Sequence, residues 1–196
     1  MEMNMRVKEK MEMVMRMRKI ALAKLFIPFG IAGVTVLFFW FFVEPEVTAG
    51  YAAVFSIYSF MPIGGAVAAI PAGLGLDVPP VGLISFIVFT DAVLALFLVW
   101  NFDYARKIPG IGKLVERAEE SGEKAIRKYK WAKRFGFMGV VFLVMFPLQW
   151  TGSAVGAMVG RLIGMTPLMT WLAVILGTFI RSTLTTLISI GVLSFM

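Results

Sequence analysis

Four ionisable side chains lie in or beside the apolar half of this 196-residue chain, and they are its main candidates for chemistry. These residues are Asp77, Asp91, Arg161 and Arg181. Asp91 and Arg181 fall near the middle of the long apolar segments 81–100 and 168–194. An unpaired charge at the centre of a bilayer costs at least about 2.5 kcal/mol. We therefore expect both residues to be paired, hydrated or protonated, and to approach each other.

Two interpretations of Asp91 and Arg181 remain open from the sequence. In the functional interpretation, Asp91 is a carboxylate that couples transport to protons or binds a cation, and Arg181 contacts an anion. In the structural interpretation, the two residues form an ion pair that holds helices together.

The residue types that are missing exclude most catalytic chemistry. Without Cys or His, the chain has no thiolate nucleophile, no Ser-His-Asp triad and no Cys-ligated zinc or His-held haem. No second mid-membrane Asp accompanies Asp91, as an aspartyl protease requires, and no phosphate-binding loop for ATP is present. Seven of the first 17 residues are Met, whose thioethers can bind Cu(I). A flexible or weakly helical tail is the simpler explanation of this tract. We expect neither an enzyme nor a cofactor or metal.

Composition and charge predict a membrane protein. The chain is 59% hydrophobic and 16% charged, with a mean hydropathy of +0.85, whereas soluble domains are about 45 to 50% apolar. Lys and Arg outnumber acids by seven to three in residues 1–24 and by ten to five in 101–134. Because both blocks flank apolar segments, the net charge of +7 fits the positive-inside rule, with no role for nucleic acid. We expect a multi-pass protein of the cell (inner) membrane with a cytoplasmic N-terminus.

Counting the crossings indicates that one apolar segment turns back. Segment 25–43 is long enough for a retained transmembrane helix, and the acidic loop 44–50 suits the outer face. If both 51–76 and 81–100 crossed, the basic block 101–134 would lie outside. Met61-Pro62-Ile63-Gly64-Gly65 interrupts the first of these segments, so we expect it to be a re-entrant hairpin.

The second half of the chain repeats this layout. A ten-residue arm, 137–146, is followed by the break Pro147-Leu148-Gln149-Trp150-Thr151-Gly152. The chain then returns in segment 153–164, and segment 168–194 is long enough to span the membrane. Since the two hairpins would enter from opposite sides, the pattern predicts an inverted repeat around a midplane site. Five plain transmembrane helices, with the second and fourth kinked, are the alternative. The expected substrate- or ion-binding residues are Asp91, Arg181, Pro62, Gly64, Gly65, Pro147, Gln149, Thr151 and Gly152.

The predicted fold is therefore an all-α integral membrane protein with three transmembrane helices and two oppositely oriented re-entrant hairpins. Its expected parts are a basic Met-rich cytoplasmic tail (1–24), a transmembrane helix (25–43), a first repeat (51–100), a cytoplasmic amphipathic helix (101–134) and a second repeat (135–196). The pattern of residues 111–129 favours an amphipathic helix on the membrane surface, although a solvated connector also fits.

A stripe of glycines at every fourth position indicates close helix packing: Gly152, Gly156, Gly160 and Gly164. Gly65, Ala69 and Gly73 form a similar stripe on the first returning arm. We expect the two arms to pack on each other or across a homodimer, and packing without any role in transport is the simpler interpretation.

The segment 136–165, with its Phe-Pro-Leu-x-x-Thr-Gly-Ser-Ala-Val-Gly core, resembles the Pro-Leu-Pro-x-Thr-Gly signature of the small multidrug export family. More distantly, the order of elements over residues 51–196 is similar to the DedA/VTT superfamily of lipid-carrier transporters and scramblases. Pro62-Ile63-Gly64 stands where the export family often carries Glu-Leu-Arg, and Met145 and Gln149 lie where DedA-type hairpins carry arginines. Charge roles at those positions cannot be carried over.

The favoured function is transport of an amphipathic, anionic lipid-type substrate, as a flippase or lipid-carrier transporter, with proton coupling open. If the returning arms begin as helices at the breaks, their free N–H groups and Arg181 favour an anionic head such as a lipid phosphate. The expected partners are the lipid bilayer and a lipid or small amphipathic substrate. The alternatives are an exporter of small cationic drug-like molecules, a lipid scramblase, and a membrane scaffold that does not transport.

Overall fold

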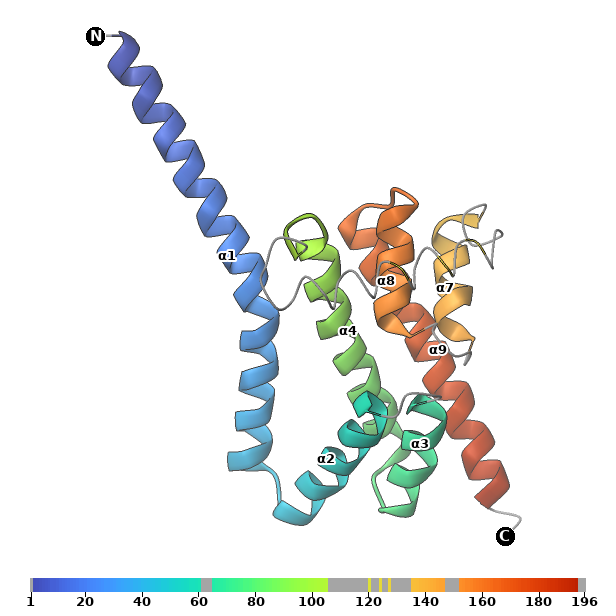
Figure 1. Cartoon of the computed structure of the whole chain (residues 1–196). Helices are drawn as coiled ribbons and strands as arrows, with labels where there is room; N and C mark the ends of the chain where they lie inside the picture. Colours follow the sequence, from blue (N-terminus) through green and yellow to red (C-terminus); the bar gives the residue numbers. More distant parts are fainter. Residues whose placement is uncertain are drawn as a thin grey trace.

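The computed structural model of the chain describes residues 2–60, 65–105, 135–146 and 152–193, together with Glu120, Lys124 and Arg127. Within these ranges all regular secondary structure is helical (Figure 1). The helices are α1 (Glu2–Phe42), α2 (Pro45–Phe60), α3 (Gly65–Gly75), α4 (Pro80–Ala105), α7 (Phe137–Met145), α8 (Ser153–Leu162) and α9 (Pro167–Leu193).

Three helices are long and apolar enough to cross a membrane. Their candidate spans are Leu22–Phe42 in α1, Pro80–Phe102 in α4 and Pro167–Val192 in α9. At 1.5 Å per residue, the 16 residues of α2 reach about 24 Å, short of the roughly 30 Å of hydrocarbon, and the 11 residues of α3, nine of α7 and ten of α8 reach less. For the described residues, the prediction of an all-helical fold with three long apolar helices is confirmed, and the alternative of five plain spans is not supported.

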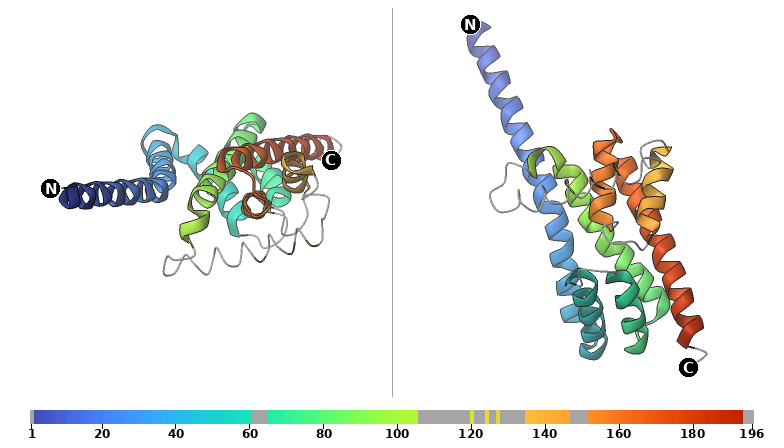
Figure 2. Two further views of the ribbon diagram at one scale, coloured as in Figure 1. Left: turned by 90° about the horizontal axis from the view of Figure 1, so that it is seen from above. Right: turned by 45° about the vertical axis from the view of Figure 1, so that its right-hand side comes forward.

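The four short helices form two pairs at opposite ends of the long ones. α2 packs against α3 at the lower end of Figure 1, and α7 packs against α8 at the upper end. α4 and α9 run between the two ends and pack extensively on each other. Figure 2 shows the same arrangement from a second side, with the N-terminal part of α1 projecting beyond the other helices.

Both pairs lead into the next long helix through the same local structure. After α3, Asp77 (φ 58°) takes a left-handed conformation and Val78 N donates to Gly73 O at 3.0 Å. After α8, Gly164 (φ 88°) does the same and Met165 N donates to Gly160 O at 3.0 Å. These are Schellman caps, which satisfy the last carbonyls of a helix.

Prolines open three of the helices, because a proline at the first helical position loses no hydrogen bond and has φ preset near its helical value. They are Pro45, Pro80 and Pro167. Helix α2 starts directly at Pro45, because Thr48 N donates to the carbonyl oxygen of Glu44 at 2.9 Å. The prediction of a loop over residues 44–50 was therefore wrong. The Met-rich tail is likewise helical, since α1 begins at Glu2 and continues into the first span.

The core has a main part and a smaller part. Buried side chains of α4, α7, α8 and α9 form the main hydrophobic cluster. Val54, Ala69, Val78 and Leu83 form the smaller cluster, where α2 and α3 meet the beginning of α4. α1 stays outside both, with only 6% of its span buried. The fold therefore leaves α1 as a peripheral wall beside the other described helices.

Two of the four glycines in the predicted stripe lie close to neighbouring side chains. A Cβ at Gly156 would lie 2.3 Å from Val144 Cγ2, and one at Gly160 would lie 2.4 Å from Thr170 Cγ2. In contrast, a Cβ at Gly152 or Gly164 meets nothing within 4 Å among the described residues, because these glycines flank the helix as its caps. α3 and α8 pack mainly against their hairpin partners and the long helices, not on each other. Packing of the two arms across a homodimer stays a prediction.

Candidate functional site

Asp91 on α4 and Arg181 on α9 form a buried ion pair. Arg181 Nη2 donates to Asp91 Oδ2 at 3.0 Å, and Arg181 and Asp91 are 5% and 1% exposed. The prediction that these two side chains approach each other is confirmed. Whether they bind a substrate or only hold the helices together is a separate question, which depends on their other contacts.

Asp91 accepts a full set of four hydrogen bonds. Oδ1 accepts from the hydroxyls of Tyr58 at 2.6 Å and Ser153 at 2.8 Å. Oδ2 accepts from the hydroxyl of Thr178 at 2.7 Å as well as from Arg181. A carboxylate offers about four lone-pair sites, so all those of Asp91 are used in this conformation.

The donors to Asp91 come from both halves of the chain. We call Tyr58, Asp91, Ser153, Thr178 and Arg181 the central cluster. Arg181 Nη2 also donates to Tyr58 Oη at 2.9 Å, and Arg181 Nη1 donates to the carbonyl of Val144 on α7 at 3.4 Å. Helices α2, α4, α7, α8 and α9 therefore meet at these few side chains. Separating the halves would break several hydrogen bonds and a buried ion pair at once.

Helix periodicity explains how α4 and α9 present these groups. Asp91 is the twelfth residue of α4 and Thr178 the twelfth residue of α9, each counted from the proline that opens the helix. The two therefore occupy equivalent places, and they hydrogen-bond each other directly. Arg181 follows Thr178 by three residues, so it lies on the same face of α9 one turn later.

The N-terminus of α8 adds to the positive surroundings of Asp91. Ser153 is the first residue of α8, after the N-cap Gly152 (φ −64°, ψ 178°), which makes no side-chain capping bond. Because the Ser153 hydroxyl donates to Asp91, the carboxylate lies beside the positive end of this helix. A buried charge requires such compensation by a counter-charge and hydrogen bonds.

Unused polar groups lie on α9 next to the cluster. Within the described part of the chain, Arg181 Nε, Ser182 Oγ, Thr183 Oγ1 and Thr186 Oγ1 are buried and have no hydrogen-bond partner. Other hydroxyls in the long helices donate to their own helix, as Ser189 does to Thr185 O at 2.8 Å. The cluster thus has an unused donor on Arg181, while the oxygens of Asp91 are all engaged.

Among the remaining predicted site residues, Gly65 and Gly152 adjoin members of the cluster, and the others lie outside the described residues. Gly65 opens α3 and approaches Tyr58, since a Cβ there would lie 2.5 Å from the Tyr58 carbonyl oxygen. The residues outside the described ranges are Pro62, Gly64, Pro147, Gln149 and Thr151.

The other two ionisable residues singled out in the sequence lie near helix ends. Asp77 is exposed in the cap after α3. Arg161 donates to Met165 O at 2.9 Å, and its Cζ lies 5.5 Å from the centroid of the Phe102 ring. Neither residue contributes to the central cluster.

The sequence analysis missed Tyr58, Ser153 and Thr178. Each has a signal that could have drawn attention to it. Tyr58 is a polar residue close to a break, Ser153 directly follows the glycine that ends the second break, and Thr178 lies one helical turn before Arg181. Hydroxyl residues are common in membrane helices, however, and such signals select these three only after the partners are known.

No group of three or more His, Cys, Asp or Glu residues that could hold a metal ion occurs among the described residues.

Three long apolar helices and a buried ion pair between two of them define a multi-pass membrane protein. A family model described as "Putative small multi-drug export protein" matches residues 66–184, more than half of the chain. The chain belongs to this family. No curated protein and no solved structure matches it.

The matched segment contains most of the central cluster. Asp91, Ser153, Thr178 and Arg181 fall within residues 66–184, whereas Tyr58 lies before them. α1 and α2 are likewise outside the match. The ion pair and two of its hydroxyl partners therefore lie in the part of the chain that the family model covers.

Proposed function

We propose that this protein is a transporter that moves an amphipathic substrate with an anionic head group, and that it is not an enzyme. The family description refers to export, which agrees with a transporter. The anionic head is inferred from the central cluster. The substrate class proposed is a lipid-type molecule carrying a phosphate or a similar oxyanion.

One observation carries the preference for an anion. All four acceptor sites of Asp91 are occupied, while Arg181 Nε has no partner in the described part of the chain. A cation would have to displace Arg181 or a hydroxyl from Asp91 before it could bind. An oxyanion can instead accept a hydrogen bond from Arg181 while the ion pair persists, and Arg is well suited to phosphate.

The α2–α3 and α7–α8 pairs are proposed to be re-entrant hairpins of an inverted repeat. Three features support this: their positions at opposite ends of α4 and α9, the shared Schellman caps, and the equivalent places of Asp91 and Thr178. In such transporters the substrate site lies where the repeats meet, near the midplane. The central cluster is then the contact between repeats that must open for transport.

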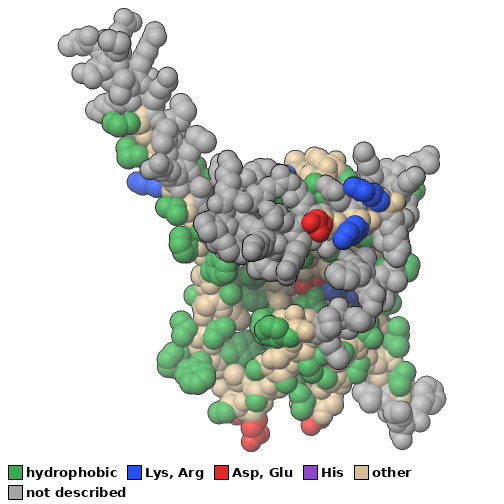
Figure 3. Space-filling view, in the orientation of Figure 1, with side chains coloured by type: hydrophobic (Ala, Val, Ile, Leu, Met, Phe, Trp, Pro, Cys, Tyr) green, Lys and Arg blue, Asp and Glu red, His purple; other side chains and the backbone are tan. Residues whose placement is uncertain are grey.

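The proposed topology puts the N-terminus and residues 101–134 in the cytoplasm. Figure 3 shows acidic side chains at the lower end of the molecule, and Lys or Arg side chains together with an acidic one at the upper end. The positive-inside rule counts Lys and Arg, so it favours an upper cytoplasmic side. In the naturally Cys-free chain, Glu46→Cys and Asp77→Cys should react with an impermeant thiol reagent from outside. Glu120→Cys and Lys124→Cys should react only after the membrane is opened. Reaction of Glu120→Cys from outside in intact cells would refute this topology.

The decisive experiment measures translocation in liposomes that contain the purified protein. The substrates are a head-group-labelled fluorescent phosphatidic acid and a labelled polyprenyl phosphate, each with and without a pH gradient. We expect movement of both anionic lipids well above protein-free liposomes. Movement that stops when the gradient is removed would identify proton coupling, which requires Asp91 to leave Arg181 during the cycle.

A double variant without either charge distinguishes a binding role of the ion pair from a structural one. Asp91→Asn combined with Arg181→Gln removes both charges, so no unpaired charge is left in the membrane. If Arg181 holds the anionic head, the double variant folds but loses transport. If the double variant transports lipid at the wild-type rate, the anion site at Arg181 is refuted and the ion pair is structural. Uptake of a small organic cation without any lipid movement would instead support the cationic exporter.

A further inference from the structure

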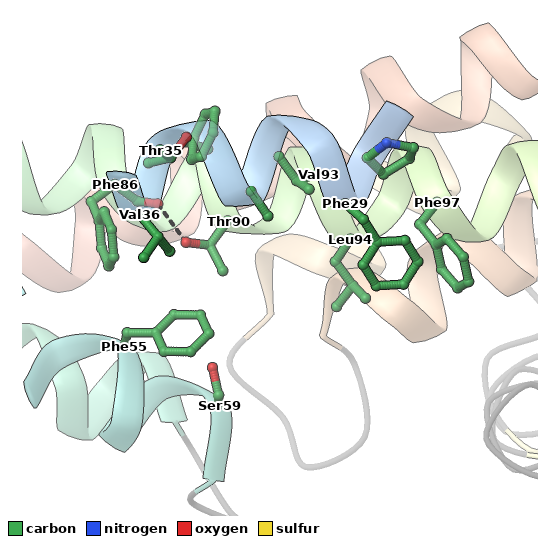
Figure 4. Close-up of a pocket in the computed structure, with 13 residues that line it drawn as sticks. Phe29, Thr35, Val36, Phe55, Ser59, Phe86, Thr90, Val93, Leu94 and Phe97 are labelled. Carbon is green, nitrogen blue, oxygen red and sulfur yellow. Dashed lines mark hydrogen bonds between the residues drawn. The ribbon is translucent and has the colours of Figure 1, made fainter. Parts of the chain in front are cut away.

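An apolar groove runs along α4 on the side away from its ion pair. Its volume is about 510 Å³, and its walls come from α1, α2 and α4. Figure 4 shows Phe29 and Val36 on α1, Phe55 and Ser59 on α2, and Thr90 and Phe97 on α4. Pockets of roughly 300 to 1,000 Å³ are typical of sites for small organic ligands.

Aromatic contacts between α1 and α4 limit the groove at both ends. The rings of Phe29 and Phe97 meet at one end, with centroids 5.4 Å apart, and those of Phe39 and Phe86 meet at the other, 6.2 Å apart. Asn101 Nδ2 also donates to Lys24 O at 2.9 Å, which fixes α1 to the end of α4. From Phe86 to Phe97, α4 rises about 16 Å. The space is therefore long and narrow.

The walls offer no polar head group a place to bind. The hydroxyls of Thr35 and Thr90 donate to carbonyls of their own helices, Ile31 O and Phe86 O, both at 2.9 Å. The other wall residues named above are hydrocarbon except Ser59 at the α2 edge. Burying a polar group without a partner is costly, whereas burying a hydrocarbon chain against aromatic and aliphatic walls is favourable.

The groove lies at the same depth as the central cluster. Thr90 on its wall directly precedes Asp91, and Ser59 directly follows Tyr58. The groove extends from Phe86 to Phe97, so its centre falls near Asp91 along the axis of α4. The groove and the central cluster therefore border the same middle part of α4, on different faces of this helix.

We propose that this groove binds one hydrocarbon chain of the transported substrate. The proposal rests on the proposed function, because it assigns a place to the tail of the same amphipathic molecule. The α1 and α2 walls lie outside residues 66–184, which the family model matches. Preference for a particular chain is then set partly by residues that the family segment does not contain.

A matched pair of substitutions on α1 tests the site. Val36 lines the groove and is 66% exposed, while Val34 is 68% exposed and is not among the lining residues. Val36→Trp should fill the groove and slow transport of long-chain phosphatidic acid by about tenfold, which corresponds to about 1.4 kcal/mol. Val34→Trp adds the same ring to the lipid-facing side and should transport normally. Equal transport by the two variants would overturn the proposal.

Photolabelling provides a readout that does not depend on transport. Phosphatidic acid with a diazirine on one acyl chain should label the groove walls of α1 and α4 in the wild-type protein and in Val34→Trp. Labelling should be lost in Val36→Trp. Equal labelling by phosphatidylcholine with the same chain would show an ordinary bilayer lipid in the groove and would overturn the assignment to the substrate.

The two proposals can fail separately. If the wild-type protein moves no anionic lipid, the proposed function fails. Selective labelling by the anionic probe would then still support chain binding in the groove. Transport that is insensitive to Val36→Trp, together with no labelling of the walls, would leave the proposed function standing and overturn the groove as a tail site.

Discussion

Replacing Arg181 alone with Gln is expected to destabilise the protein more than any other single charge removal among the described residues. The change leaves Asp91, which is 1% exposed, without a counter-charge. Breaking a buried ion pair in this way typically costs about 3 to 5 kcal/mol, whereas removing both charges together costs much less. For a chain of this size we expect the apparent Tm to fall by roughly 10 °C.

The measurement is thermal unfolding of the purified protein in lipid nanodiscs for Arg181→Gln, Asp91→Asn and the double variant. The double variant should be more stable than Arg181→Gln, since the amide that replaces the Asp91 carboxylate can still accept from neighbouring hydroxyls. Arg161→Gln is the matched control. It removes the same charge from α8, where Arg161 is partly exposed and lies outside the cluster, so a smaller loss is expected. A double variant less stable than both single variants would contradict the pair as described.

Gly65→Ala is expected to open the α2–α3 pair and to displace Tyr58 from the central cluster. A Cβ at Gly65 would lie 2.5 Å from the carbonyl oxygen of Tyr58, which is a backbone atom and cannot rotate away. Overpacking of this kind costs about 1 to 3 kcal/mol. Since Tyr58 donates to Asp91 and accepts from Arg181, its displacement should weaken both contacts.

Gly75→Ala is the control on the same helix, because a Cβ at Gly75 meets nothing within 4 Å among the described residues. This variant should unfold at or slightly above the wild-type temperature, while Gly65→Ala should unfold several degrees lower. Tyr58→Phe tests the contacts of the Tyr58 hydroxyl with Asp91 and Arg181 without a clash, because it removes only that hydroxyl. If Gly65→Ala were as stable as Gly75→Ala, the close approach of α3 to Tyr58 would be wrong.

The sequence by itself determined where the chain is apolar, where it breaks and which charges lie at mid-depth. Hydropathy and charge depend only on local composition, so the three long helices could be predicted from runs of apolar residues. The breaks predicted at Pro62 and Pro147 fall outside the described residues. Asp91 and Arg181 could be chosen because a charge in hydrocarbon needs a partner, and each stands near the middle of a long span.

Local sequence also led to a wrong prediction at Pro45. Pro45 was taken as part of an outer loop, although a proline at the first position is a common start of a helix, as it is for α2. Gly152 and Gly164 share the spacing of the predicted packing stripe, and in the structure they flank α8 as its caps. A glycine can serve packing, capping or a left-handed turn, and spacing alone does not distinguish these roles.

Only the tertiary structure decided which side chains complete the site and where the groove lies. Tyr58 and Arg181 are separated by 123 positions, and Asp91 and Thr178 by 87. Helices that are apolar all round carry no periodic signal for the face that turns inward, so the sequence could not select Thr178 over other hydroxyls on α9. The contacts of the central cluster depend on how five helices rotate and pack against one another, and that is a property of the whole fold.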